Sequence, residues 1–381
     1  MNVHRNSGSL LKKSASGLLL AALLLLLPGF SWGAAQRDRG SPRAAQPAQA
    51  ETVLFTDSSG RTVELPAKIT RIAPSGSLAQ MFLLAAAPDL LCAVSAPYSG
   101  GEAEFVPAYL QGLPVVGQFY GAQNLNPEEL AVINPDVIID IGEPKDSIAA
   151  DMDQISASVA VPAIHITATL ASTPDAFRTL GKLLGREAHG EALVVFCEKT
   201  LAAADAVEAR AGNNKREVLY CLGNAGLNVL PKTSFHSEVL DKLTDNKAVV
   251  DNPAGRGSGN ETNLEQILLW DPEVIIFGTG SIYASAGSDP AWRQLRAIRN
   301  GAYYEVPSGP HNWMGTPPSI NRYLGMLWLG KILYPEYASY NLYAEVAEYY
   351  RLFYGYTLSR ERYDRLTARS LHAGGPGRGD V

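Results

Sequence analysis

The sequence predicts an α/β fold in which two similar lobes are joined by a single long helix, with a ligand cleft between the lobes. Three observations predict it: a helix-then-strand unit occurs twice, the strands are continuous apolar runs, and one long helical segment separates the two units. Continuous apolar strands are typical of parallel sheets that are covered on both faces. The length of 381 residues allows two lobes of ordinary domain size.

The repeated unit occupies residues 126–139 and 263–276. In each copy an apolar helical pattern runs into Asn134-Pro135 or Asp271-Pro272, and Val-Ile-Ile follows after one further residue. The residue before a proline disfavours the helical region, so each copy predicts a short amphipathic helix that ends there and a buried strand. Shorter apolar runs predict further strands at 71–73, 91–94, 115–116, 163–166, 217–221, 248–250 and 303–306. Residues 78–86 predict one more helix.

A long helical segment divides the two copies. It starts at Thr173-Pro174-Asp175, with proline at the first helical position and an acid in the first turn, and its pattern continues to about Ala211 with a break near Gly185. This predicts an N-terminal lobe over 51–172, a helical spine over 173–211 and a C-terminal lobe over 212–367. Because the spine is too long for a simple crossover, the junction of the lobes is the expected ligand crevice.

The two ends of the chain read as segments outside the fold. Residues 1–33 have the pattern of a secretory signal peptide: cations precede the ten-residue apolar run 18–27, and small residues follow. A spanning helix needs about 20 residues, so a cleaved leader is favoured over a permanent anchor, and the predicted location is the periplasm. The compositions of 34–50 and 368–381 predict a disordered linker and a disordered tail.

Charge and motif content favour a binding protein. The net charge of −6 gives no footprint for nucleic acid. The three cysteines, Cys92, Cys197 and Cys221, allow at most one disulfide, and neither they nor the histidines have the spacing of a metal site. GxSxG, GxGxxG and P-loop motifs are absent from the sequence, so neither a catalytic residue nor an intrinsic cofactor is predicted. A periplasmic enzyme whose catalytic residues are far apart in sequence is the alternative.

Candidate ligand-binding residues follow the predicted strands, because ligands of open α/β sheets bind outside the carboxyl ends of strands. Aromatic and small polar side chains dominate these loops, and they suit a flat or bulky ligand with a polar edge. For each aromatic the alternative is a role in capping a sheet, and for the histidine and the arginine it is ordinary packing. The candidates are Ser75, Tyr98, Phe119, Tyr120, Glu143, Asn224, Tyr283, His311, Trp313 and Arg322.

Three stretches together carry a family resemblance: 71–75, 126–140 and 292–328, the last with Asn-Gly-Ala-Tyr-Tyr-Glu-Val-Pro at 300–307. Over about residues 52–345 the chain resembles the substrate-binding proteins of ABC importers for metal chelates, the class that handles iron-siderophores, haem and cobalamin. The resemblance implies two Rossmann-like lobes, an interlobe cleft, and a monomer that delivers its ligand to a membrane permease and its ATPase. Residues 308–322 resemble a branch that also holds molybdate and tungstate binders.

Two questions remain open at the level of the sequence: which class of ligand binds, and which residue of the first lobe contacts the permease. A bulky chelate would use four aromatics, Tyr98, Tyr120, Tyr283 and Trp313. An oxyanion would use backbone N–H groups near Ser75, Gly142 and Gly278, with His311 or Arg322. The number of aromatics favours the chelate. The resemblance also implies one acidic docking residue on each lobe for the permease. Glu238 fits in the second lobe, but Leu78 occupies the corresponding place in the first, which puts that contact in doubt.

Overall fold

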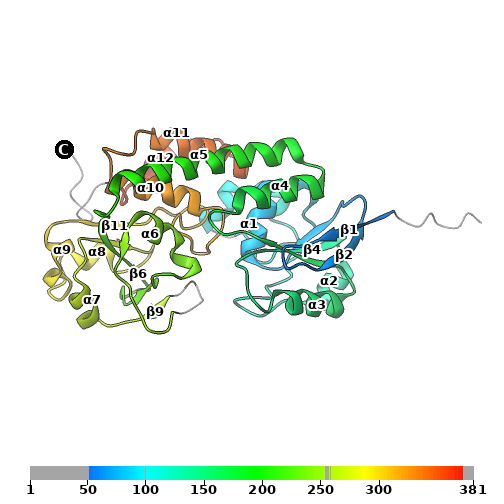
Figure 1. The fold of residues 1–381 in the computed structure, drawn as a ribbon, viewed down its shortest axis with the longest axis horizontal. Helices are drawn as coiled ribbons and strands as arrows, with labels where there is room; N and C mark the ends of the chain where they lie inside the picture. The colour runs from blue at the N-terminus through cyan, green and yellow to red at the C-terminus, as the bar shows by residue number, and fades with distance from the viewer. Residues whose placement is uncertain (1–50, 99, 254–256, 258, 372–381) are drawn as a thin grey trace, which may run out of the picture. The chain divides into compact units, whose positions relative to one another are not determined.

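Figure 1 shows two α/β lobes covered on one side by a layer of long helices, as the sequence predicts. This computed structural model describes residues 51–98, 100–253, 257 and 259–371, and the chain from Ala50 onward forms one compact unit. The predicted signal peptide, the linker and all but the first residues of the predicted tail lie outside the described residues. None of the described helices is long and apolar enough to cross a membrane.

The first lobe is built on a parallel sheet of three strands in the order β3-β4-β5. The predicted strands at 91–94 and 115–116 form only isolated bridges, and the sequence analysis missed an antiparallel hairpin that precedes the sheet. The elements of this lobe are β1 (Thr52–Thr56), β2 (Thr62–Pro66), β3 (Ile72–Pro74), α1 (Ser77–Ala86), α2 (Pro127–Ile133), β4 (Val137–Gly142), α3 (Ile148–Val159) and β5 (Ala163–Thr167), with the short 3-10 helices η1 (Pro88–Leu90), η2 (Gly100–Phe105) and η3 (Ala108–Leu110).

The second lobe repeats the order of the first and extends it. Its sheet runs β11-β10-β6-β7-β9, in which β11, β10 and β6 are parallel, and β8 pairs with β6. The predicted strand at 248–250 is wrong, because the chain leaves the sheet after β8. The elements are β6 (Glu217–Leu222), β7 (Asn228–Val229), η4 (Phe235–Ser237), α6 (Glu238–Leu243), β8 (Asp245–Asn246), β9 (Asn260–Glu261), α7 (Leu264–Trp270), β10 (Val274–Phe277), α8 (Tyr283–Ala286), η5 (Trp292–Gln294), α9 (Arg296–Arg299) and β11 (Tyr303–Glu305).

The sequence repeat corresponds to α2–β4 and α7–β10. Each helix is capped by an asparagine whose side chain accepts from a backbone N–H three residues later, Asn126 from Glu129 and Asn263 from Gln266. Each helix ends at the predicted residue before proline, which adopts the left-handed conformation: φ is 50° at Asn134 and 32° at Asp271. The predicted helix ends are therefore confirmed, and the asparagine caps are a further feature that the two copies share.

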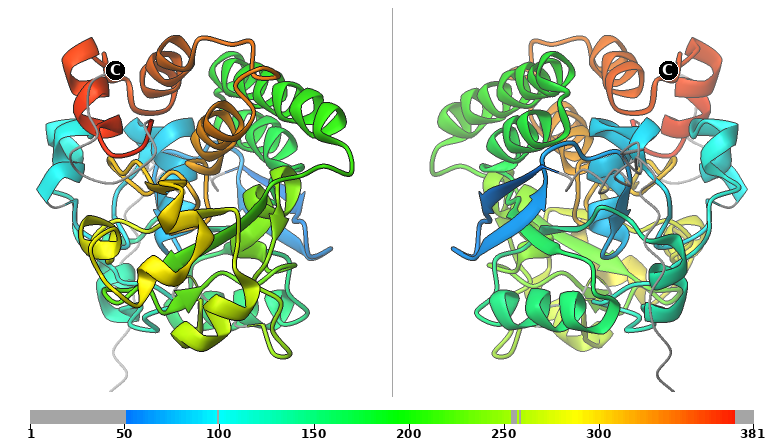
Figure 2. Two further views of the ribbon diagram at one scale, coloured as in Figure 1. Left: turned by 90° about the vertical axis from the view of Figure 1, so that its left-hand side faces the viewer. Right: turned by 90° about the vertical axis from the view of Figure 1, so that its right-hand side faces the viewer.

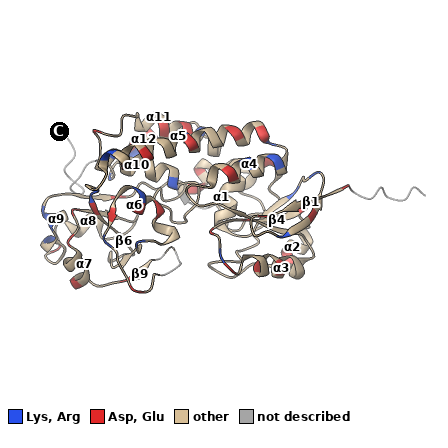
Figure 3. Ribbon diagram, viewed as in Figure 1, with Lys and Arg blue, Asp and Glu red and all other residues tan. Residues whose placement is uncertain are grey.

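The helical layer contains the predicted spine and the C-terminal helices. α4 (Thr173–Leu184) ends at Gly185, whose φ is 63°, and α5 (Glu187–Ala211) follows with 25 residues. Arg178 on α4 pairs with Glu198 on α5 at 2.6 Å, among the charges visible along these helices in Figure 3. α10 (Arg322–Leu333), α11 (Leu342–Tyr354) and α12 (Arg360–Thr367) lie in the same layer (Figure 2). The layer is thus thicker than the single helix the sequence suggested.

Candidate functional site

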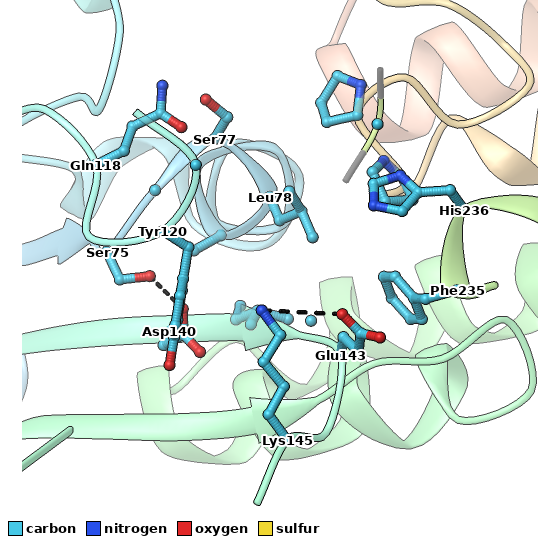
Figure 4. Close-up of a pocket in the computed structure, with 18 of the residues that line it drawn as sticks. Ser75, Ser77, Leu78, Gln118, Tyr120, Asp140, Glu143, Lys145, Phe235 and His236 are labelled. Atoms are coloured by element: carbon cyan, nitrogen blue, oxygen red, sulfur yellow. Dashed lines mark hydrogen bonds and ion pairs between the residues drawn. The ribbon is translucent and has the colours of Figure 1, made fainter. Parts of the chain in front are cut away.

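A cavity of about 430 Å³ lies between the two lobes, at the carboxyl ends of β3 and β4 (Figure 4). The first lobe supplies most of the lining, and the second lobe supplies one wall from η4, residue 257 and the segment before α10. The lining residues are Ser75, Gly76, Ser77, Leu78, Ala79, Gln118, Tyr120, Gly121, Asp140, Ile141, Gly142, Glu143, Lys145, Phe235, His236, Gly257, Thr316, Pro317 and Pro318.

The N-terminus of α1 forms one side of the cavity. Its N-cap, Gly76, is extended and provides no side-chain cap, and the first turn contains no acidic residue. The N–H groups of a first helical turn have no partner within the helix, and the helix dipole places partial positive charge there. Gly142 lies against this turn with a φ of 155°, and a Cβ added to it would approach Leu78 Cδ2 to 3.0 Å. This side of the cavity therefore suits hydrogen-bond acceptors and anions.

Lys145 adds the only Lys or Arg side chain among the lining residues of this cavity in the described chain. Its ammonium lies 4.3 Å from the centre of the Tyr120 ring and 3.8 Å from a Glu143 carboxylate oxygen. Burial raises the pKa of Glu143, and Lys145 opposes this effect. The Tyr120 hydroxyl donates to Asp151 at 2.6 Å, and burial and this bond raise its pKa. The Tyr120 hydroxyl therefore stays protonated, and its ring is held in one orientation at the cavity wall.

A chain of buried polar groups forms the floor. Ser75 Oγ donates to one oxygen of Asp140, and His165 Nδ1 lies 2.7 Å from the other. His165 Nε2 lies 3.2 Å from the Thr167 hydroxyl. Asp140 retains only 6% of its accessible surface. Because burying a carboxylate is costly unless it is hydrogen-bonded, this chain explains how Asp140 is tolerated inside a strand of the core.

The second-lobe wall rests on a buried ion pair. Phe235 lines the cavity and covers the guanidinium of Arg322 at 4.7 Å, and Arg322 pairs with Glu238. Glu238 also accepts from Leu170 N at 3.2 Å, and Arg322 donates to Ala168 O at 3.2 Å. Burial lowers the pKa of Arg322, and Glu238 opposes this effect. Since 168 and 170 follow β5, the pair ties the second lobe to the first immediately behind the cavity.

Three of the ten sequence-predicted ligand residues line the cavity: Ser75, Tyr120 and Glu143. Phe119 lies one layer behind, edge-on to Tyr120 at 5.0 Å between ring centres. Arg322 lies behind Phe235, and Asn224 and His311 are outside the lining.

The other predicted aromatics are placed in the core and not on the cavity wall. Tyr98, Tyr283 and Trp313 are buried, with Trp313 fully inaccessible. Tyr283 packs edge-on against Tyr303 at 5.6 Å, as the sheet-capping alternative had it. These three side chains lie in loops that follow strands, but the loops fold back onto the sheets and bury the aromatic rings in the core.

Several cavity residues were missed at the sequence level, among them Leu78, Gln118, Asp140, Lys145, Phe235 and His236. Asp140 was the one with a usable signal, since a lone acid interrupts the apolar run of β4. The others come from loops and helix starts with no distinctive pattern.

The described residues contain no group of three or more His, Cys, Asp or Glu side chains placed to hold a metal ion, and Cys92, Cys197 and Cys221 are free thiols. Glu238, predicted to dock the permease, is occupied by Arg322 and Leu170, with 26% of its side chain exposed. Its docking role stays a prediction.

Two parallel-sheet lobes with a cavity between them are the arrangement of a protein that holds a solute. The chain belongs to the periplasmic binding protein family, which matches residues 113–310, just over half of its length. This confirms the family resemblance, and it agrees with the prediction of a binding protein over an enzyme.

The chain is also similar to individual proteins of this kind. It is 25% identical to the Fe(3+)-citrate-binding protein YfmC of Bacillus subtilis over 184 residues, 48% of this chain and 56% of the relative. The chain thus spans little more than half of that curated relative. Among solved structures, an ABC transporter solute-binding protein from Sulfurospirillum deleyianum has a TM-score of 0.76 at 29% identity, covering 83% of this chain and 99% of that one.

A third similarity supports the fold alone. The molybdate-bound MolA of Haemophilus influenzae superposes with a TM-score of 0.64 at 17% identity, covering 81% of this chain and 99% of that protein. With the Sulfurospirillum structure, it confirms the predicted α/β architecture of two lobes.

Proposed function

We propose that this protein is the periplasmic solute-binding component of an ABC importer and that it captures an anionic metal chelate, which it delivers to a membrane permease and ATPase. The observation that carries the proposal is the interlobe cavity, where the uncapped start of α1 and the ammonium of Lys145 provide hydrogen-bond donors and positive charge. The family and the ferric-citrate-binding relative support the same reading.

The size of the cavity favours a chelate over a bare oxyanion. Its volume of about 430 Å³ lies within the range of about 300–1,000 Å³ that small-molecule pockets occupy. Molybdate or tungstate is the alternative, and the donors of α1 and the molybdate-binding relative MolA, 29% identical over 97 residues, favour it. Haem and corrinoids are less favoured, because the lining residues that the structure describes offer few aromatic rings: Tyr120, Phe235 and the imidazole of His236.

The proposal is tested on the mature chain with a panel of ferric citrate, ferric siderophores, haem, cobalamin, molybdate and tungstate. We expect a ferric chelate to raise the unfolding temperature and to bind with measurable heat, because a ligand that binds only the folded state stabilises it. Lys145→Gln should weaken binding by about tenfold, equal to about 1.4 kcal/mol. Lys199→Gln is the matched control, since Lys199 pairs with Glu345 and Glu348 in the helical layer. Stabilisation by none of the ligands would overturn the proposal.

A further inference from the structure

We infer that the floor of the cavity selects ligands that carry a hydrogen-bond donor, because Ser75 and Asp140 present only acceptors there. The inference rests on the proposed function and deepens it. It describes the ligand as an anion that bears at least one hydroxyl, protonated oxygen or N–H group in addition to its acidic oxygens.

The strand register places the three side chains of the floor next to one another. In the parallel sheet Asp140 on β4 is paired with His165 on β5. Pro74 of β3 is paired with Ile139, so Ser75 follows at the level of Asp140, and its backbone N–H donates to Ile139 O at 3.1 Å. Neighbouring strands lie about 5 Å apart, which lets short side chains at one level hydrogen-bond in a row.

The single hydroxyl proton of Ser75 is used within the protein. Its Oγ donates to Asp140, so its two lone pairs are what remain for a ligand. Ser75 lines the cavity with only 1% of its surface exposed, and this burial holds the hydroxyl in this arrangement. A ligand atom above Ser75 must therefore donate.

Asp140 is fixed as an acceptor by its second partner. His165 Nδ1 lies 2.7 Å from Asp140 Oδ2, and the imidazole is held at its other nitrogen by Thr167. His165 itself is 1% exposed, and its backbone N–H donates to Asp57 at 3.3 Å. The side chain cannot turn away without breaking both contacts, so its two oxygens stay in place at the floor.

The opposite side of the same cavity presents hydrogen-bond donors and positive charge, whereas the floor presents acceptors. The start of α1 begins two residues after Ser75 and presents backbone N–H groups, and Lys145 adds an ammonium. A fully deprotonated oxyanion would satisfy this side but would place its own oxygens against the acceptors of the floor. A ligand with both kinds of group satisfies the whole cavity, because each unmatched buried polar group carries a desolvation penalty.

The test uses pairs of probes that differ in one donor: phosphate against sulfate, and citrate against tricarballylate, each titrated by calorimetry near neutral pH beside ferric citrate. We expect the donor-bearing member of each pair to bind at least tenfold more tightly to the wild-type chain. Asp140→Asn places an amide N–H in the floor and should bring the ratio close to one or invert it. Ser75→Ala should lower the ratio at least threefold, and it keeps the test open if Asp140→Asn does not fold.

The control is Asp153→Asn, which makes the same chemical change on α3 at an exposed carboxylate paired with Arg61, outside the cavity lining. It should leave both ratios unchanged. Equal binding of the two members of each pair, or tight binding of molybdate in preference to every donor-bearing probe, would overturn the inference and leave the binding function intact. Binding of no probe, ferric citrate and molybdate included, would reject the proposed function, and the inference would fall with it.

Discussion

The two lobes share one helix-strand unit and one strand order, yet they differ at one position of the central strand, which in the first lobe lines the cavity. At matched register the first lobe has Asp140 on its central strand and the second has Phe277. Asp140 lines the cavity and accepts a hydrogen bond from Ser75, whereas Phe277 packs against Trp292 with ring centres 5.3 Å apart. The repeated unit therefore determines the fold of each lobe, and the residue at this position of the central strand, Asp140 or Phe277, determines whether the strand end is polar.

The difference extends to the strands on either side. Cys221 is paired with Phe277 at the level that Ser75 has beside Asp140, and Glu305 takes the level of His165. Burial raises the pKa of the Cys221 thiol, so it stays protonated. At this level the second lobe packs Phe277 against aromatic rings, and its acid, Glu305, pairs with Arg369 at 3.3 Å. The lobe contributes to the cavity through η4 and the segment before α10 instead.

The largest effect should come from Phe277→Ala. Emptying this fully buried ring position should lower the free energy of unfolding by about 3–5 kcal/mol. Ligand affinity should change little at temperatures where the variant is folded, because Phe277 does not line the cavity. Urea unfolding and calorimetry measure the two quantities. Leu269→Ala, at a 79% exposed position on α7 of the same lobe, is the control. A large loss of affinity without a loss of stability would contradict the comparison.

The second effect is a loss of stability at acid pH, and it comes from His311. Burial lowers the pKa of His311 to about 4 from its usual 6.5, and the nearest Glu102 oxygen, at 3.7 Å, is beyond hydrogen-bond distance. The unfolded chain therefore takes up this proton near pH 6.5, but the folded chain does so only near pH 4, so stability falls as the pH drops through this window. The loss due to His311 should approach about 3 kcal/mol at pH 4.

His311→Phe should remove this part of the acid destabilisation. The free energy of unfolding from urea titrations at pH 7, 5.5 and 4 should fall less steeply for the variant than for the wild type. His189→Phe serves as a comparison at an exposed histidine of α5, whose Nε2 lies 2.7 Å from Ala85 O. Parallel pH curves for His311→Phe and wild type would show that folding does not lower the pKa of His311.

The smallest effect should come from Glu238→Gln, at the place where the lobes touch. Removing this charge leaves the buried guanidinium of Arg322 without its carboxylate, and because Glu238 is partly exposed we expect a loss of about 2 kcal/mol. Glu261→Gln, at an exposed acid on β9, should have no measurable effect. An unchanged stability of Glu238→Gln would show that the pair does not tie the lobes together and would favour the docking role for this acid.

The sequence predicted the fold more fully than the site. The asparagine caps and the Pro-terminated helices are local signals, so α2 and α7 could be located within a few residues. Short strands such as β1 and β2 carry weak patterns, and they escaped prediction. Of the candidate ligand residues, Ser75, Tyr120 and Glu143 follow the rule that ligands bind at strand ends. Tyr283 and Trp313 obey the same rule in sequence, but their loops fold inward.

By itself, the sequence determined the α/β class, the two copies and the long helix, because periodicity, capping and proline act over a few residues. Only the tertiary structure decided which lobe supplies the cavity floor, that Asp140 is held by Ser75 and His165, and that Arg322 is a buried tie and not a free cation. These contacts join residues 25 to 84 positions apart. Such contacts depend on how strands are registered and how loops pack, which no local pattern encodes.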